Sequence, residues 1–273
     1  MSKLSSSTIL IVGGGRMGSA LLSGWISSGI QTEQIILVEP DTKSALVHSS
    51  NGINVVSSPA DLPNGYNPDA LVLAIKPQYV SPVISSYKKY LNQTIIISVA
   101  AGITIKKIQN AVGHLPIVRA MPNTPAAIGK GITVACVNSK VNGIQKSLSY
   151  KLLEVTGKMV WIENELYMDG VTAVSGSGPA YVFLLIECLC EAGIAIGLPP
   201  KLSSQLAEMT VAGAGELAIL AEESPTNLRQ NVTSPGGTTA AALDILNGPN
   251  GMPDLLIRAV AAAAKRSKEL SEE

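Results

Sequence analysis

A glycine-rich turn near the start of the chain has the residue types and spacing that hold a diphosphate. Gly13, Gly15 and Gly18 match the pattern GxGxxG, directly after the apolar run TILIV that ends at Val12. In this pattern the first glycine allows a tight turn, the second lets a pyrophosphate approach the backbone, and the third lets the following helix pack on the strand. The free N–H groups and the dipole at the helix start attract phosphates. The turn therefore predicts a dinucleotide site.

The end of the next apolar run predicts where the adenosine ribose binds. Glu39 follows QIILV, and an acid at this place holds the ribose 2′-hydroxyl of NAD and repels the 2′-phosphate of NADP. Thr42, Lys43 and Ser44 follow at once and could recruit that phosphate. Alternatively, Glu39 and Lys43 are exposed charges of a turn. The choice between NAD and NADP stays open at this point.

Two further apolar runs end in residues that can lie beside a nicotinamide. Lys76 and Pro77 follow ALVLAI, and Ala100 and Ala101 follow TIIISV. Ligands of open α/β sheets bind at the carboxyl ends of the strands, where small residues permit close approach. Close packing of helices explains the two alanines nearly as well.

Two loops in the second half of the chain place hydroxyl groups and flexible backbone at the start of a helix. Residues 175–181 read SGSGPAY and residues 231–239 read NVTSPGGTT. Such helix starts suit a small carboxylate. The alternative is a pair of well-capped helix starts, with Ser177 as the expected cap of the first. Two such loops in a chain with a dinucleotide motif favour a substrate site.

The scarcity of candidate bases and metal ligands limits the classes of reaction that the chain can catalyse. Oxidising an alcohol requires a positioned base such as His or Lys, but both histidines, His48 and His114, lie in the first half and are expected at the surface or behind the site. No spacing suggests a metal site, and the three cysteines are expected to be reduced thiols. A C=N bond suits this scarcity, because a protonated imine needs only a hydride and a hydroxyl group that orients its nitrogen.

The apolar runs also predict the elements that position these residues. Short β-branched runs alternate with helical segments at 8–12, 34–38, 53–56, 70–75, 94–100, 116–120, 131–137 and 159–162. Fully apolar runs of this kind are typical of parallel strands covered on both faces. Residues 1–163 are therefore predicted to form a dinucleotide-binding α/β domain with a doubly wound, Rossmann-like sheet.

The second part of the chain predicts an all-helical domain over residues 164–273. Ala- and Leu-rich helical segments are expected at 164–174, 179–197, 200–223, 225–231, 238–247 and 252–271. Residues 180–197 are apolar enough to suggest a membrane span, but Glu187 and Glu191 favour a buried helix of a soluble protein. With 20 basic and 20 acidic residues, the chain is expected to bind no nucleic acid, and we expect a cytoplasmic protein.

Six segments together resemble the pyrroline-5-carboxylate reductase family. They are GGGRMG at 13–18, AIKPQ at 74–78, SVAAG at 98–102, RAMPNTPA at 119–126, SGSGPAYVF at 175–183 and LRQNVTSPGGTT at 228–239. The resemblance runs nearly end to end. It implies an oxidoreductase that reduces 1-pyrroline-5-carboxylate to L-proline with NADPH or NADH, the last step of proline biosynthesis. It also implies a homodimer whose helical domains interlock and complete the site, and rings of such dimers.

The resemblance assigns roles to residues of this sequence. The implied cofactor contacts are Val12, Gly13, Gly14, Gly15, Arg16, Met17, Gly18, Glu39, Ala74, Ile75, Lys76, Pro77, Val99, Ala100 and Ala101. The implied substrate contacts are Ser234, Gly236, Gly237, Thr238 and Thr239. Thr239 is the implied catalytic residue, because its hydroxyl would hydrogen-bond the ring nitrogen. Many relatives carry small hydroxyl residues where this chain has Glu39, so we predict that both NADPH and NADH are accepted.

Two other functions compete with this interpretation. A reductase of the hydroxyacid-dehydrogenase type would need a lysine on the helix that follows SGSGP, and residues 181–197 contain none. A dinucleotide-sensing protein without turnover would bind the cofactor but would have no use for the hydroxyl-rich loop 234–239.

Overall fold

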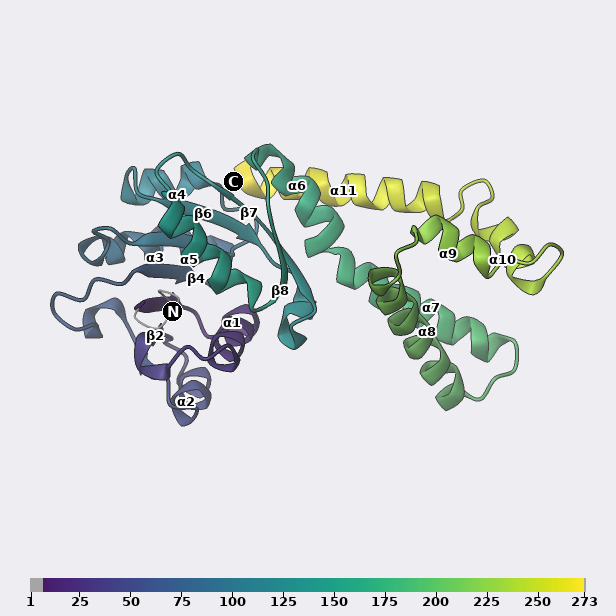
Figure 1. Ribbon diagram of the computed structural model, residues 1–273, viewed down its shortest axis with the longest axis horizontal. Coiled ribbons are helices and arrows are strands. Elements are labelled where there is room, and N and C mark those ends of the chain that lie inside the picture. Colours follow the sequence, from purple (N-terminus) through teal and green to yellow (C-terminus); the bar gives the residue numbers. More distant parts are fainter. Residues whose placement is uncertain (1–6, 273) are drawn as a thin grey trace. The chain divides into compact units, whose positions relative to one another are not determined.

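The computed structural model describes residues 7–272, which form two compact units. The first unit consists of two segments, the chain up to Gly176 and the residues from Ala264 onward. The second unit comprises Ser177–Ala263. Both units are drawn in Figure 1. The first unit therefore extends past residue 163, where the sequence predicts the end of the first domain, because residues 165–176 pack with the sheet rather than with the helices that follow.

The first unit is built on an eight-stranded sheet with the order β3-β2-β1-β4-β5-β6-β7-β8. The strands are β1 (Ile9–Val12), β2 (Ile35–Val38), β3 (Asn54–Val56), β4 (Ala70–Leu73), β5 (Ile95–Ser98), β6 (Ile117–Met121), β7 (Gly131–Val137) and β8 (Gly157–Trp161). The first six are parallel to one another. The predicted Rossmann-like sheet is confirmed, and each predicted strand is present, most of them shortened by one to three residues.

The direction of β7 differs from the prediction. This strand pairs antiparallel with β6, and β8 then runs parallel to β7. The reason is the short connection: only residues 122–130 separate β6 from β7, and they form a 3₁₀ helix at Thr124–Ile128. A parallel crossover needs a dozen or more residues, so the chain turns back instead.

Helices cover both faces of the sheet, as Figure 1 shows. They are α1 (Arg16–Ser27), α2 (Thr42–Ser50), α3 (Pro77–Ile84), α4 (Ile105–Val112) and α5 (Gly143–Glu154). Alternate strand residues face opposite cores: Ile11 packs with Trp25 of α1 and Leu152 of α5, whereas Leu10 packs with Ile84 of α3. The indole Nε1 of Trp25 donates to the Leu152 carbonyl at 2.8 Å and so joins α1 to α5.

The predicted helix 164–174 is broken into three short pieces. A 3₁₀ turn (Glu165–Tyr167), α6 (Met168–Val171) and a π-helical turn (Thr172–Gly176) follow one another. Side chains tie this segment to the rest of the first unit: Glu165 binds Arg119 of β6 at 2.9 Å, and Asp169 accepts from Ser267 of α11 (Met252–Glu272) at 2.7 Å.

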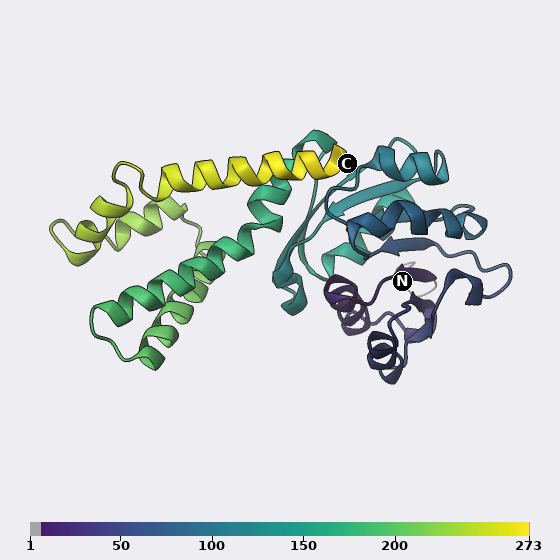
Figure 2. The same ribbon diagram turned by 180° about the vertical axis from the view of Figure 1, so that it is seen from behind.

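The second unit is helical, as the sequence predicts. It contains α7 (Gly178–Ala195), α8 (Pro200–Leu220), α9 (Pro225–Asn231), α10 (Thr238–Leu246) and the first part of α11. Helices α7 and α8 lie side by side (Figure 2), and Ser203 of α8 donates to the Cys190 carbonyl of α7 at 2.7 Å. Gly193 makes this approach possible, because a Cβ there would collide with the Ser203 hydroxyl.

Many large apolar side chains of the second unit are exposed in the single chain. Phe183 of α7 is 57% exposed, and Leu184, Met209 and Leu217 are exposed as well. The helical run Glu165–Ala195 is long and apolar enough to cross a membrane by length and composition, with a mean hydropathy of 1.5 over its most apolar window. Exposed apolar surface of this kind marks a site of interaction with another protein or with a membrane.

Candidate functional site

The turn between β1 and α1 has the geometry of a diphosphate cradle. Gly13 has a φ of +98°, which favours glycine, and a Cβ at Gly18 would collide with the Gly13 carbonyl oxygen. By contrast, apart from Gly15 itself and its two chain neighbours, no atom of the described chain lies within 4 Å of the place that a Cβ of Gly15 would take. Gly15 is the N-cap of α1, so open space lies beside the free N–H groups of the helix start. The turn therefore fits a bound pyrophosphate, as the sequence predicts.

Side chains from α1, from α2 and from the residue that follows β2 fix the peptide groups of Gly14. The Gly14 N–H donates to Glu39 Oε2 at 2.7 Å, and its carbonyl accepts from Ser19 Oγ at 2.9 Å and His48 Nε2 at 3.0 Å. His48 is only 6% exposed, so it lies behind the cradle rather than at the surface. The sequence offers no signal for this role, because 34 residues separate His48 from Gly14.

The other predicted cofactor residues follow strands that are neighbours in the sheet. Val12 and Leu73 are register partners, the Ala74 N–H donates to the Val12 carbonyl, and the Val99 N–H donates to the Leu73 carbonyl. The carboxyl ends of β1, β4 and β5 therefore lie at one edge of the sheet, beside the cradle. Val99 and Ala100 are buried, whereas Ala101 is partly exposed at the same edge.

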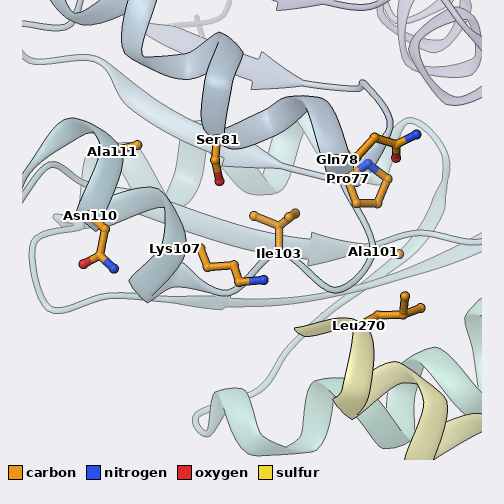
Figure 3. A pocket seen from close by; sticks show the side chains of 9 residues that line it. All are labelled: Pro77, Gln78, Ser81, Ala101, Ile103, Lys107, Asn110, Ala111 and Leu270. Atoms are coloured by element: carbon orange, nitrogen blue, oxygen red, sulfur yellow. The ribbon is translucent and has the colours of Figure 1, made fainter. Parts of the chain in front are cut away.

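A groove of about 860 Å³ opens at this edge (Figure 3). Two predicted cofactor residues, Pro77 and Ala101, line it. Its apolar floor includes Ile103 and Leu270, and Lys107 of α4 contributes the charged group. The groove thus continues from the predicted nicotinamide end of the site between α3 and α4.

The predicted substrate residues form the turn before α10 in the second unit. Gly236 has a φ of +69°, and the Gly237 N–H donates to the Ser234 carbonyl at 3.0 Å, so the turn is compact. Gly237 is the N-cap of α10 and, being glycine, has no side chain with which to cap it. The N–H groups of the first turn, which carries Thr238 and Thr239, are therefore available to an anion.

The expected cap at Ser177 is wrong. Ser177 has helical backbone angles, and its hydroxyl caps no N–H group among the described residues. The physical reason is that the π-helical turn Thr172–Gly176 runs directly into α7, so the chain has no extended residue at the position where an N-cap forms.

Two polar residues of the segment RAMPNTPA have structural partners that sequence analysis missed. Arg119 is buried and pairs with Glu165, whose same oxygen, Oε1, accepts from the Ile105 N–H at 2.9 Å. Asn123 accepts from the Ile132 N–H at 2.9 Å and donates to Ser175 Oγ at 3.4 Å. Both residues join the end of β6 to the segment that leads into α7, and spacing alone gives no sign of such distant partners.

The Cys136 thiol is held in its neutral form, and the described residues form no metal cluster. Burial raises the pKa of the Cys136 thiol to about 11, so the thiol stays protonated at neutral pH. Within residues 7–272, no group of three or more His, Cys, Asp or Glu side chains is placed to hold a metal ion. The absence of a metal from the working protein stays a prediction.

Comparison with known proteins identifies relatives of both halves of the chain. A family model described as pyrroline-5-carboxylate reductase dimerisation matches residues 165–270, and one described as NADP oxidoreductase, coenzyme F420-dependent, matches residues 8–102. A pyrroline-5-carboxylate reductase of Pisum sativum is 38% identical over 268 residues, 97% of each chain. One of Pseudomonas aeruginosa is 36% identical and covers 99% of each chain.

Solved structures agree with these relatives. A pyrroline-5-carboxylate reductase from Coxiella burnetii superposes with a TM-score of 0.91 at 36% identity, covering 97% of this chain and 99% of that one. A pyrroline carboxylate reductase from Plasmodium falciparum, solved with NADP bound, superposes with a TM-score of 0.85 at 34% identity and covers 98% and 99% of the two chains.

Proposed function

This chain belongs to the pyrroline-5-carboxylate reductase family, and from that premise we propose how its residues reduce 1-pyrroline-5-carboxylate to L-proline. The reaction is the last step of proline biosynthesis. NADH or NADPH, when bound, supplies the hydride that is transferred to the imine carbon. The chain itself must then bind both molecules, orient them and hydrogen-bond the nitrogen.

The observation that carries this proposal is the start of α10. Its open N–H groups and the Thr239 hydroxyl lie within one turn of a helix, and residues 231–243 contain no titratable side chain. Such a site binds a carboxylate and offers a hydroxyl, but it cannot abstract a proton from an alcohol. An imine with a neighbouring carboxylate matches these groups.

In the first unit, the cradle would hold the cofactor. The N–H groups at the start of α1 would bind the pyrophosphate, with Gly15 leaving room for it. Glu39 would accept hydrogen bonds from the adenosine ribose. The backbone at Ala74 and Val99–Ala101 would face the nicotinamide end, with Lys76 and Pro77 beside it.

In the second unit, the turn before α10 would hold the substrate. Its carboxylate would sit on the backbone of Gly236, Gly237 and Thr238. It would accept hydrogen bonds from the N–H groups of Gly236 and Thr238, aided by the helix dipole, while the Gly237 N–H closes the turn onto the Ser234 carbonyl. The protonated imine nitrogen would donate to the Thr239 hydroxyl oxygen. This bond orients the ring, and the proton that the product keeps on nitrogen is already in place before the hydride arrives.

The competing functions are less well supported. A hydroxyacid-dehydrogenase mechanism lacks its lysine, since none lies in α7 (Gly178–Ala195). A non-catalytic sensor would have no need of Thr239 at the open start of α10.

We also propose a homodimer formed by the second unit, and rings of such dimers. The match of residues 165–270 to a dimerisation family and the exposed apolar side chains of α7 support a dimer. We further propose a cytoplasmic location without membrane insertion. The three free cysteines, none of which is in a disulfide within the described residues, support a reducing compartment. Glu187 and Glu191 of α7 argue against insertion, because acidic side chains are costly in lipid.

The test is the initial rate of NADH and NADPH oxidation with 1-pyrroline-5-carboxylate, for the wild type, Thr239→Ala and Thr239→Ser. We expect Thr239→Ala to lower kcat by roughly 10- to 100-fold, about 1–3 kcal/mol of transition-state stabilisation, with an unchanged cofactor Kd. Thr239→Ser should retain most of the rate. The matched control is Thr226→Ala, on the exposed surface of α9.

Two results would contradict the proposal. Cofactor binding without oxidation of either dinucleotide would favour the sensor. Wild-type kcat in Thr239→Ala would remove Thr239 from the mechanism.

A further inference from the structure

We propose that this chain selects NADH over NADPH, because its own carboxylates already occupy the backbone N–H groups that a 2′-phosphate would need. The inference rests on the proposed function, since it concerns the cofactor of the same reaction. It goes beyond the sequence prediction, which left both cofactors acceptable.

The carboxylate of Glu39 is fixed by two backbone groups. Oε2 accepts from the Gly14 N–H at 2.7 Å, and Oε1 accepts from the Asp41 N–H at 2.9 Å. An ionised carboxylate has about four acceptor positions, so each oxygen keeps one for a further donor. Ribose hydroxyl groups can donate to these positions. A phosphate dianion has no proton to donate and meets a like charge.

Glu39 cannot easily swing aside, because the peptide that holds it is itself anchored. Ser19 and His48 donate to the Gly14 carbonyl at 2.9 Å and 3.0 Å. Moving the Glu39 carboxylate away would leave the buried Gly14 N–H without its partner, which is costly. The carboxylate is therefore a permanent part of the ribose site.

At the start of α2, the Ser44 N–H is taken by a carboxylate as well. Asp41 is its N-cap and accepts from the Ser44 N–H at 2.8 Å, while the Ser44 hydroxyl donates to the Gly14 carbonyl at 3.3 Å. A helix start normally attracts phosphate through such N–H groups. Here a second carboxylate occupies that place, and Ser44, which the sequence suggested as a phosphate ligand, is already engaged.

The nearby cations do not offset these two acids. Lys43 and Arg16 are both exposed, and exposed ion pairs contribute little in water. A phosphate monoester carries nearly two negative charges at neutral pH. Asp41 is exposed as well, so its charge is screened in the same way. Repulsion by the half-buried Glu39 therefore decides the preference.

The first test measures binding rather than turnover. Isothermal titration of the wild-type protein with NADH and with NADPH, without imine, gives the ratio of the two dissociation constants. We expect NADH to bind at least about tenfold more tightly. Equal or tighter binding of NADPH, or no binding of either, would overturn the proposal. Because no substrate is present, this ratio is independent of whether the chain reduces pyrroline-5-carboxylate.

Variants then locate the cause. Glu39→Gln keeps the shape and removes the charge, and Asp41→Asn keeps a good helix cap. Each should lower the NADPH-to-NADH ratio of dissociation constants, with Glu39→Gln giving the larger change, at least about threefold. The control is Glu33→Gln, an exposed glutamate just before the start of β2, which should leave the ratio unchanged.

A wild-type ratio in both Glu39→Gln and Asp41→Asn would overturn the assignment of selectivity to these acids. Circular dichroism melting curves show whether each variant is folded. If Glu39→Gln does not fold, Asp41→Asn alone decides the test.

Discussion

Changing Gly15 or Gly18 of the cradle to alanine should have opposite effects on cofactor binding and folding. At Gly15 the backbone has a φ of −67° and a ψ of −169°, which alanine adopts without strain, and the added Cβ meets open space. At Gly18 the Cβ collides with the Gly13 carbonyl oxygen, which belongs to the backbone and cannot rotate away. Gly15→Ala should therefore affect binding, and Gly18→Ala should affect folding.

The magnitudes follow from these surroundings. Alanine is a poorer N-cap than glycine, which destabilises the folded state by up to roughly 1 kcal/mol. It also restricts the unfolded chain, which stabilises the folded state by about 0.4–1 kcal/mol. The free energy of unfolding of Gly15→Ala should therefore stay within about 1 kcal/mol of the wild type, a change in Tm of at most roughly 4 °C. Overpacking at Gly18 should cost about 1–3 kcal/mol.

NADH binding should be affected more by Gly15→Ala than by Gly18→Ala, the reverse of the order in stability. The Cβ of Gly15→Ala projects into the space beside the start of α1, where the pyrophosphate approaches. We expect its dissociation constant for NADH to rise at least about tenfold, or ~1.4 kcal/mol. Gly143→Ala is the matched control, because Gly143 also begins a helix and a Cβ there meets open space far along the chain.

The assays are calorimetric titration with NADH and thermal unfolding by circular dichroism. Wild-type affinity in Gly15→Ala would refute the assignment of the cradle to the pyrophosphate. A loss of stability in Gly15→Ala as large as that in Gly18→Ala would show that the open space beside Gly15 is filled by the protein itself.

Further predictions concern the core, the interface and the response to pH. The Tyr87 hydroxyl is buried and has no hydrogen-bond partner in the part of the chain that the structure describes, so Tyr87→Phe should raise the free energy of unfolding by about 1 kcal/mol in urea titrations. A decrease of that size would instead indicate a bound partner such as water. Glu165→Ala leaves the Arg119 guanidinium buried without its ion pair and should cost about 3–5 kcal/mol; a loss below 1 kcal/mol would mean that water replaces the carboxylate. Phe183→Asp places a charge on the exposed apolar face of α7 and should convert dimers to monomers in light scattering, and an unchanged mass would place the interface elsewhere. The pKa of Cys136 is raised from 9.0 to about 11, so the folded state holds this proton more tightly than the unfolded state. Stability should therefore fall as pH rises from 9 to 11, and the fall should be shallower in Cys136→Ala.

The sequence predicts the sheet and the cradle well because both depend on local patterns. Runs such as ALVLAI are apolar at every position, as in a strand that is buried on both faces. The spacing of Gly13, Gly15 and Gly18 indicates a tight turn, room for a pyrophosphate and close packing of the following helix. The antiparallel direction of β7 was also within reach of sequence reasoning. The short connection at residues 122–130 excludes a parallel crossover, but the apolar composition of β7 resembles that of the parallel strands and hides the difference.

The parts that sequence reasoning missed depend on contacts between distant residues. His48 reaches the Gly14 carbonyl only because α2 packs behind the cradle, and Asn123 reaches Ser175 across 52 positions. Such contacts have no spacing rule, so only the folded chain reveals them.

Residues 231–243, which include the start of α10, contain no acidic or basic side chain, and this has a consequence for the pH dependence of the proposed reaction. A site with a catalytic His or Lys loses activity when that side chain changes its protonation state. Here the Thr239 hydroxyl and the backbone N–H groups of Gly236 and Thr238 do not titrate in the physiological range, so their proposed hydrogen bonds to the ring nitrogen and to the carboxylate would not change across it. Since hydride transfer requires the protonated imine, the rate should follow the protonation of the substrate itself. The enzyme therefore contributes position and hydrogen bonds, and the reacting molecule brings its own proton.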